Sequence, residues 1–249
     1  AGFYAVYHGP EGIRTIAKRI HNIAAYLEKE ISKLGYKQVN VQYFDTLRFA
    51  LPDNVSAQQV RTVALSKEVN LRYFKNGDVG IDETTDLAAV NVLLSIFGIA
   101  AGKDYTKTTD IPESCTIQST FRRQSTYLTH EVFNRYHTET EMMRYIKRLD
   151  RKDISLAHSM ISLGSCTMKL NAAAEMLPLS RPEFMNMHPL VPEEQAEGYR
   201  ELIHNLSEEL KIITGFAGVS LQPNSGAAGE YAGLRVIRAY LENIGQGHR

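Results

Sequence analysis

Residues 10–35 read Pro-Glu-Gly-Ile-Arg-Thr-Ile-Ala-Lys-Arg-Ile-His-Asn-Ile-Ala-Ala-Tyr-Leu-Glu-Lys-Glu-Ile-Ser-Lys-Leu-Gly, and this stretch decides the fold of the first hundred residues. Its apolar residues recur at steps of three and four: Ile13, Ile16, Ile20, Ile23, Leu27, Ile31 and Leu34. That spacing places them on one face of a helix. Pro10 suits the first turn of such a helix, and Gly35 suits its end. The stretch therefore predicts one long amphipathic helix.

Short strands follow this helix in the sequence. Residues 39–43 alternate between apolar and polar side chains, and residues 47–51 are an apolar run that stops before a proline. Both patterns are typical of strands. Residues 71–75 and 79–81 flank Asn-Gly at 76–77, which is a strong hairpin signal. The sequence therefore predicts a small antiparallel sheet.

Two further helices are predicted in the first hundred residues. Ser56 and Gln59 form a capping box, which opens a helix that runs to about residue 68. Thr84 or Thr85 is the expected cap of the next helix, and Gly98 is its expected end. Leu87, Val90, Leu93 and Phe97 form its buried face. Helices combined with an antiparallel sheet in this way indicate a small α+β layer.

Composition excludes several classes of protein. The 249 residues are 43% hydrophobic and 22% charged, which is ordinary for a globular chain of one large or two ordinary domains. Lys and Arg number 28, as do Asp and Glu, so a protein that mainly grips a nucleic-acid backbone is disfavoured. No apolar run is long enough to predict a membrane span. The two cysteines, Cys115 and Cys166, provide no disulfide framework and no zinc pattern, and we expect two reduced thiols.

The rest of the chain changes in character along its length. Residues 102–126 are polar and rich in Ser and Thr, and we interpret them as a linker or extended arm. Residues 138–150 predict a helix that begins with a second capping box, Thr138 and Glu141. A long helix is predicted from Pro192 or Glu193 to Thr214. Residues 219–221 predict a short strand, and a final helix runs to about Asn243.

The turn between that strand and the final helix carries the sharpest chemical signal. Residues 221–230 read Leu-Gln-Pro-Asn-Ser-Gly-Ala-Ala-Gly-Glu. Free N–H groups at a helix start attract phosphate, Gly226 permits close approach, and Ser225 adds a hydroxyl. The turn is neither a Walker A loop nor a Gly-x-Gly-x-x-Gly motif. On the pattern alone, an ordinary helix capped by Ser225 or Asn224 is the simpler interpretation.

A second candidate is the loop at residues 162–171, Ser-Leu-Gly-Ser-Cys-Thr-Met-Lys-Leu-Asn. Cys166 or Lys169 could act as a nucleophile there if a neighbour lowered its pKa. The nearby sequence shows no such neighbour, so a structural loop is the simpler interpretation. The eight histidines show no metal-binding spacing, and we predict no metal site.

Several motifs together resemble one known family. They are Leu163–Asn171, Pro192–Tyr199, Gln222–Ala227 with Gly229–Leu234, and, upstream, Tyr7–Gly12 and Tyr136–Tyr145. In this order they are similar to the P-protein of the glycine cleavage system, a pyridoxal-phosphate enzyme family. The resemblance covers essentially the whole chain.

The resemblance implies an α/β fold. Members of the family are far longer than this chain and consist of two related halves, each similar to a fold-type I pyridoxal-phosphate enzyme. By this resemblance, residues 1–101 are the small C-terminal α+β domain of the first half. Residues 102–155 are the connecting linker and helix, and residues 156–249 begin the catalytic second half.

The resemblance also implies site residues. Ser225, Gly226 and Ala227 match the loop that binds the phosphate of pyridoxal 5'-phosphate (PLP). A second set, on a loop bordering the active site, comprises Ser165, Cys166, Thr167 and Asn171. The lysine that binds the coenzyme lies in a His-Lys-Thr motif that this sequence lacks. Lys169 does not match it, so we expect no catalytic residue in this chain.

The implied activity is that of the longer protein. It decarboxylates glycine and transfers the remaining aminomethyl group to the lipoylated H-protein. We expect the present chain to be an inactive fragment of a dimeric or pseudo-tetrameric enzyme, cytoplasmic in a bacterium or mitochondrial in a eukaryote. Nucleic acid and membranes are not expected partners. The alternatives are a stand-alone non-catalytic binding or assembly module, or a binder of another phosphate ligand.

Overall fold

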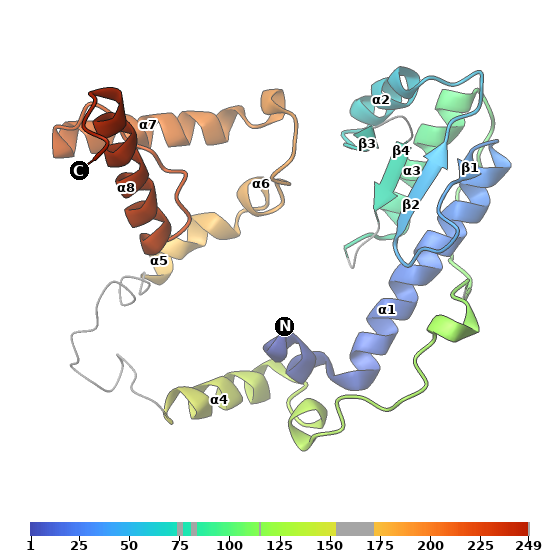
Figure 1. Ribbon diagram of the computed structural model, residues 1–249. Helices are drawn as coiled ribbons and strands as arrows, with labels where there is room; N and C mark the ends of the chain where they lie inside the picture. Colours follow the sequence, from blue (N-terminus) through green and yellow to red (C-terminus); the bar gives the residue numbers. More distant parts are fainter. Residues whose placement is uncertain (74–76, 81–83, 115, 153–171, 249) are drawn as a thin grey trace. The chain divides into compact units, whose positions relative to one another are not determined.

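A computed structural model describes residues 1–73, 77–80, 84–114, 116–152 and 172–248 (Figure 1). The chain divides into two compact units, residues 1–159 and 160–249. Helices predominate over strands. In the described part of the chain, no helix is both long and apolar enough to span a membrane.

Helix α1 (Gly2–Lys33) confirms the predicted amphipathic helix and extends it. Its backbone breaks at Gly9, where φ is 63° and ψ is 179°, so that Pro10 begins the long straight part as expected. The turn before Gly9 was not predicted. Leu34 caps the end, and Gly35 has a φ of 100°, the left-handed conformation that reverses the chain.

The four strands form one antiparallel sheet, as predicted. They are β1 (Lys37–Gln38), β2 (Thr46–Ala50), β3 (Arg72–Tyr73) and β4 (Gly77–Gly80), in the order β1-β2-β4-β3. Leu47 pairs with Val79, and Tyr73 pairs with Gly77. The hairpin is therefore present, although Gly77 belongs to a strand rather than to the turn.

The strand predicted over residues 39–43 is wrong. Strand β1 ends at Gln38, and Val41 is 89% exposed. The Asn40 side-chain amide donates to the Thr46 carbonyl oxygen at 3.1 Å. This contact closes a local loop and turns the chain away from the ladder, which the alternation of residues could not reveal.

Helices α2 (Ala57–Ser66) and α3 (Leu87–Ala101) complete the first layer. The capping box of Ser56 and Gln59 is confirmed. The cap of α3 is Asp86, whose carboxylate accepts the N–H of Ala89 at 2.8 Å, and not Thr84 or Thr85. The helix also does not end at Gly98, which is buried in its last turns.

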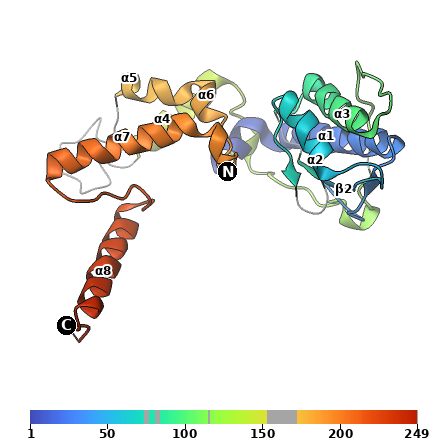
Figure 2. The same ribbon diagram turned by 90° about the horizontal axis from the view of Figure 1, so that it is seen from above.

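The core of the first unit lies between the sheet and helices α1 and α3, which cover one of its faces (Figure 1, Figure 2). Leu27 and Ile31 of α1 are fully buried there with Leu47 and Phe49 of β2. The Phe97 ring of α3 lies 5.7 Å from that of Phe49. The inward-facing residues of β2, which alternate along the strand, thus pack against the apolar residues that recur every three or four positions on α1.

Residues 103–130, here called the arm, run alongside α1 (Figure 1). One short 3-10 turn, η1 (Ser119–Phe121), interrupts them. Asn91 of α3 binds the backbone of Thr108 twice, donating to its oxygen at 3.0 Å and accepting its N–H at 2.8 Å. Asn22 of α1 accepts the N–H of Ser114 at 3.1 Å. Helix side chains therefore hold the arm as a partner strand would.

After the arm come η2 (Glu131–Asn134) and α4 (Glu139–Asp150). Thr138 caps α4 as predicted, accepting the N–H of Glu141 at 3.3 Å. The Glu141 carboxylate accepts the Thr138 hydroxyl at 3.0 Å instead of completing the capping box. Met142 of α4 and Val6 of α1 are both buried.

The second unit is helical in its described residues. Its elements are α5 (Ala173–Met176), η4 (Leu177–Ser180), α6 (Pro182–Met185), η5 (Glu193–Gln195), α7 (Glu197–Thr214) and α8 (Gly226–Asn243). Helix α7 ends at Gly215 as predicted. The strand predicted over residues 219–221 is wrong, since the described part of this unit contains no strand to pair with it. The apolar faces of α7 and α8 are exposed within the chain.

Tyr36, in the core, makes the stability of the fold depend on pH in the alkaline range. Its hydroxyl donates to the Phe97 carbonyl oxygen at 3.0 Å, and burial raises the pKa of Tyr36 to about 12. The folded state favours the neutral phenol. The contribution of Tyr36 to the free energy of unfolding is therefore complete below pH 10 and is lost as the pH rises towards 12. A shift of this size corresponds to about 2–3 kcal/mol.

We therefore expect the Tyr36→Phe variant to lose about 1 kcal/mol at pH 8, the value of one hydrogen bond, and to lose less stability than the wild type between pH 9 and 11.5. Urea unfolding followed by circular dichroism measures both effects. Tyr240→Phe, on a ring that is 62% exposed, is the matched control. Parallel wild-type and Tyr36→Phe curves across this pH range would contradict the assignment.

At Gly98, α3 and the arm lie close together. A Cβ atom there would lie 2.8 Å from Cδ1 of Tyr105 and 3.2 Å from the carbonyl oxygen of Lys103. We expect Gly98→Ala to cost about 1–3 kcal/mol by overpacking, although alanine has the higher helix propensity. Gly233→Ala on α8, where a Cβ meets nothing within 4 Å, should cost nothing. Equal unfolding midpoints in urea for Gly98→Ala and the wild type would contradict this prediction, since they would show that the arm residues move aside without loss of stability.

Candidate functional site

The turn at the start of α8 has the geometry that the sequence predicted. Ser225 is the N-cap, and its Oγ accepts the N–H of Ala228 at 3.2 Å. The helix begins at Gly226. The carbonyl oxygen of Ser225 accepts the N–H of Gly229 at 2.9 Å, which closes the first turn.

Two backbone donors at this turn are left over. The N–H groups of Gly226 and Ala227 have no acceptor among the described residues, as expected for the first positions of a helix. Ser225, Gly226 and Ala227 are all exposed. A Cβ on Gly226 would meet no described atom within 4 Å, so packing within the chain does not require glycine there. The arrangement can accept one anionic group from solvent.

The second predicted site lies outside the described residues. Ser165, Cys166, Thr167 and Asn171 all fall within residues 153–171, which the structure does not describe. Their proposed place at the border of an active site remains a prediction. In the part of the chain that is described, no three His, Cys, Asp or Glu side chains gather as a metal site.

Two of the sequence motifs meet in the first unit. The ring of His137 donates from Nδ1 to the Tyr7 carbonyl oxygen at 2.7 Å. A Cβ on Gly9 would lie 2.8 Å from Cε1 of His137 and 2.8 Å from the Phe133 carbonyl oxygen. Gly9 therefore serves both the backbone break in α1 and the approach of η2, and the motifs at 7–12 and 136–145 form one packing unit.

Two aromatic rings near that unit lie next to a cationic side chain. The rings of Tyr136 and Tyr145 stack with centroids 4.4 Å apart, and the Arg148 guanidinium lies 5.5 Å and 5.4 Å from them. Lys147 pairs with Asp150 at 2.6 Å. These basic side chains are exposed, but each already interacts with side chains close to it in the sequence.

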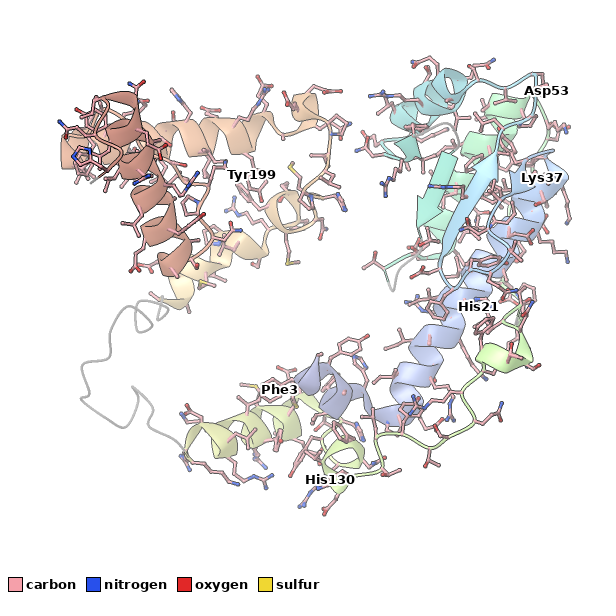
Figure 3. The ribbon with its side chains drawn as sticks, viewed as in Figure 1. Phe3, His21, Lys37, Asp53, His130 and Tyr199 are labelled. Carbon is pink, nitrogen blue, oxygen red and sulfur yellow. The ribbon has the colours of Figure 1, made fainter. Side chains whose placement is uncertain are left out.

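His21 is a structural residue that the sequence did not single out (Figure 3). It is 3% exposed, and its Nδ1 lies 2.9 Å from the Phe44 carbonyl oxygen. Its Nε2 accepts the N–H of Thr116 at 3.1 Å. Because the carbonyl can only accept and the N–H can only donate, the ring is the neutral Nδ1–H tautomer. In the sequence, the available signal for its burial was its position directly after Ile20, which belongs to the apolar face of the helix.

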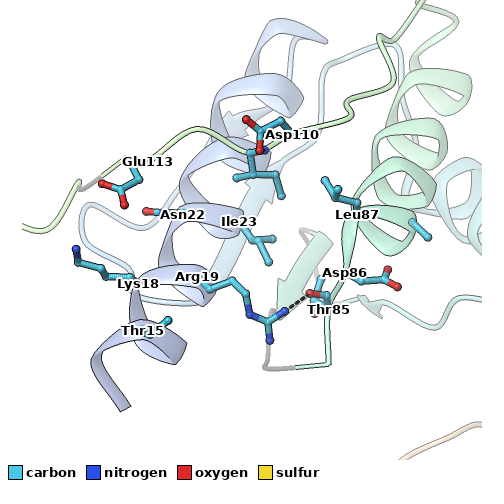
Figure 4. A pocket seen from close by; sticks show the side chains of 12 residues that line it. Thr15, Lys18, Arg19, Asn22, Ile23, Thr85, Asp86, Leu87, Asp110 and Glu113 are labelled. Carbon is cyan, nitrogen blue, oxygen red and sulfur yellow. Dashed lines mark hydrogen bonds between the residues drawn. The ribbon is translucent and has the colours of Figure 1, made fainter. Parts of the chain in front are cut away.

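A cavity of about 680 Å³ opens between α1, the start of α3 and the arm (Figure 4). Lys18 and Arg19 line it together with the acidic residues Asp86, Asp110 and Glu113. Arg19 donates to the Thr85 carbonyl oxygen at 3.5 Å. Asp86 caps α3, and the Asp110 carboxylate accepts the N–H of Ile111 at 2.8 Å. The charges are mixed and mostly serve the local fold, so this cavity indicates no particular ligand.

Comparison with known proteins supports the resemblance. Residues 1–97 match the family model described as "Glycine cleavage system P-protein". Over its whole length the chain is 80% identical to a glycine dehydrogenase (decarboxylating) of Bacteroides thetaiotaomicron, of which it covers 26%. Proteins of the same name from Bacteroides fragilis and Shewanella amazonensis are 81% and 52% identical, again over the whole chain and 26% of their length.

These matches cover the undescribed residues as well as the described ones. The chain spans about a quarter of the length of the curated relatives, 26% in each case. The chain is thus similar over its whole length to proteins named glycine dehydrogenase (decarboxylating), and its residues 1–97 match the glycine cleavage system P-protein family.

Proposed function

We propose that this chain forms part of a PLP-dependent enzyme that decarboxylates glycine. The observation that carries the proposal is 80% identity, over the full chain, to a relative named glycine dehydrogenase (decarboxylating). The family name adds a role in the glycine cleavage system. Glycine is then the substrate, and a lipoylated H-protein is the acceptor of the aminomethyl group. The bacterial relatives favour a cytoplasmic location.

The domain assignment is part of the same proposal. Residues 1–101 are the small domain of a first fold-type I half, residues 102–155 the connection, and residues 156–249 the start of the second half. The antiparallel sheet and its helices support the first assignment. The helical second unit carries exposed apolar faces on α7 and α8, as expected of elements that pack on further chain.

In this proposal the start of α8 holds the phosphate of PLP. The N–H groups of Gly226 and Ala227 donate to it, and the helix dipole favours its charge. The Ser225 hydroxyl can donate to the phosphate while its oxygen still accepts the N–H of Ala228. When bound, PLP supplies the electron sink that decarboxylation requires. The part of this chain is to hold and orient the phosphate.

Ser225→Asp separates capping from phosphate binding. Aspartate is as good an N-cap as serine, so α8 should keep its helicity. Its carboxylate repels a phosphate, so PLP affinity should fall at least about tenfold. The measurement is PLP titration of the full-length protein that contains this sequence, followed by coenzyme absorbance, with circular dichroism as the folding control.

The matched variant is Ser225→Thr, which keeps the hydroxyl, the cap and the neutral charge. It should bind PLP within about threefold of the wild type, as expected for a conservative change at a cap. If Ser225→Asp and Ser225→Thr bind PLP equally well, the phosphate site lies elsewhere and Ser225 only caps the helix.

The 249-residue chain alone should not decarboxylate glycine. It lacks the His-Lys-Thr motif expected to carry the coenzyme lysine. Incubation with glycine, PLP and lipoylated H-protein should release no labelled carbon dioxide above background, whereas a full-length relative serves as the positive control. Release that depends on the purified chain would disprove this expectation and would require a catalytic lysine within it.

A further inference from the structure

A second hollow of about 780 Å³ lies between α1 and the arm, and it is here called the arm groove. It is lined by six residues of α1 between Ile13 and Asn22, by Phe44, and by the arm residues Glu113, Ser114, Ile117, Phe121, Arg122, Arg123, Ser125 and Tyr127. Its volume falls in the range of small-molecule sites, about 300–1,000 Å³. The groove lies wholly within the first unit, far in sequence from the turn at Ser225.

Part of the lining of the arm groove is apolar. It consists of Ile13 and Ala17 of α1, Phe44, and Ile117 and Phe121 of the arm. The Phe121 ring, on the short turn η1, is 69% exposed. Burying this ring against a ligand would remove apolar surface from water.

The charged residues that line the arm groove are mostly cationic. Of the described residues that line it, Arg14, Lys18, Arg122 and Arg123 carry positive charge, and Glu113 carries negative charge. His21 also lines the groove, and both of its ring nitrogens are within hydrogen-bond distance of backbone groups. The whole chain has 28 basic and 28 acidic residues, so this local excess does not follow from composition. An anion is the complementary ligand.

The two arm arginines are held by the arm itself. Nε of Arg122 donates to the Ile117 carbonyl oxygen at 3.0 Å, and Nε of Arg123 donates to the Ser125 carbonyl oxygen at 3.3 Å. The Arg123 guanidinium also lies 5.0 Å from the Tyr127 ring centroid. Each guanidinium has four further N–H donors. The backbone thus orients both groups and leaves donors that match a planar anion.

We propose that the arm groove binds a small aromatic anion, with its ring against the apolar lining residues and its charged group at Arg122 and Arg123. The proposal does not depend on the coenzyme site at α8, and it concerns a separate ligand. The His21 and Asn22 contacts to the arm keep the two walls in place.

The chain contains no tryptophan, so Phe121→Trp introduces a single fluorescent reporter into the groove. The probe is 4-nitrobenzoate, a contact quencher, and its neutral isostere is 4-nitrobenzamide. We expect saturable quenching by the carboxylate, with affinity at least about fivefold above that of the amide and weakened by salt. Adding Arg122→Gln or Arg123→Gln should weaken binding about two- to fivefold each.

Three controls make the test specific. Phe216→Trp places the reporter on a ring of matched exposure, 68%, outside the groove, and should show only linear collisional quenching. Arg144→Gln removes an exposed charge outside the groove and should leave the affinity unchanged. Ser225→Asp should also leave it unchanged, which separates this site from the coenzyme site.

Two results would overturn the proposal. Linear quenching, equal for both probes and for both reporter positions, means that no site exists. Saturable quenching that is equal for carboxylate and amide, and insensitive to Arg122→Gln and Arg123→Gln, means that the groove binds apolar rings without recognising charge.

Discussion

Burial of the apolar face of α1 is the constraint on which the first unit depends. Leu27 and Ile31 are fully buried, and each such side chain contributes about 1.5–3 kcal/mol. The cover comes from α3 and from β2, whose fully buried Leu47 and Phe49 face the helices. The reversal at Gly35 returns the chain at once to this interface and brings the Tyr36 ring to 4.9 Å from Phe97. The sheet needs only short strands because the helices bury its face.

The arm is held by a different kind of interaction. Among the described residues its backbone pairs with no strand, and Asn91, Asn22 and His21 supply hydrogen bonds to it instead. These neutral side chains satisfy backbone groups without burying charge, which would cost far more. The same arrangement leaves the charged side chains of the arm at its surface, where Arg122 and Arg123 line the arm groove. One extended segment thus fixes the fold and offers a binding surface.

Local signals in the sequence were predicted well. The caps at Ser56, Thr138 and Ser225 are confirmed because a capping residue binds donors within its own first turn. The candidate site at the start of α8 was predictable for the same reason. The strand predictions for residues 39–43 and 219–221 were wrong because a strand forms only where a partner strand provides the hydrogen bonds of the ladder. Gly98 was misjudged because its role, close approach of Tyr105, involves a contact outside its helix.

The sequence by itself determined the amphipathic helices, their caps and the family, because these depend on spacing and residue identity along a short stretch or on similarity over the whole chain. The tertiary structure alone decided which side chains hold the arm, why Gly9 faces His137, and where Phe44, Phe121 and four cations gather. Many of those contacts join residues far apart in the sequence, such as His21 and Thr116. No local pattern encodes them, since packing and hydrogen bonding bring such residues together only once the whole unit has folded.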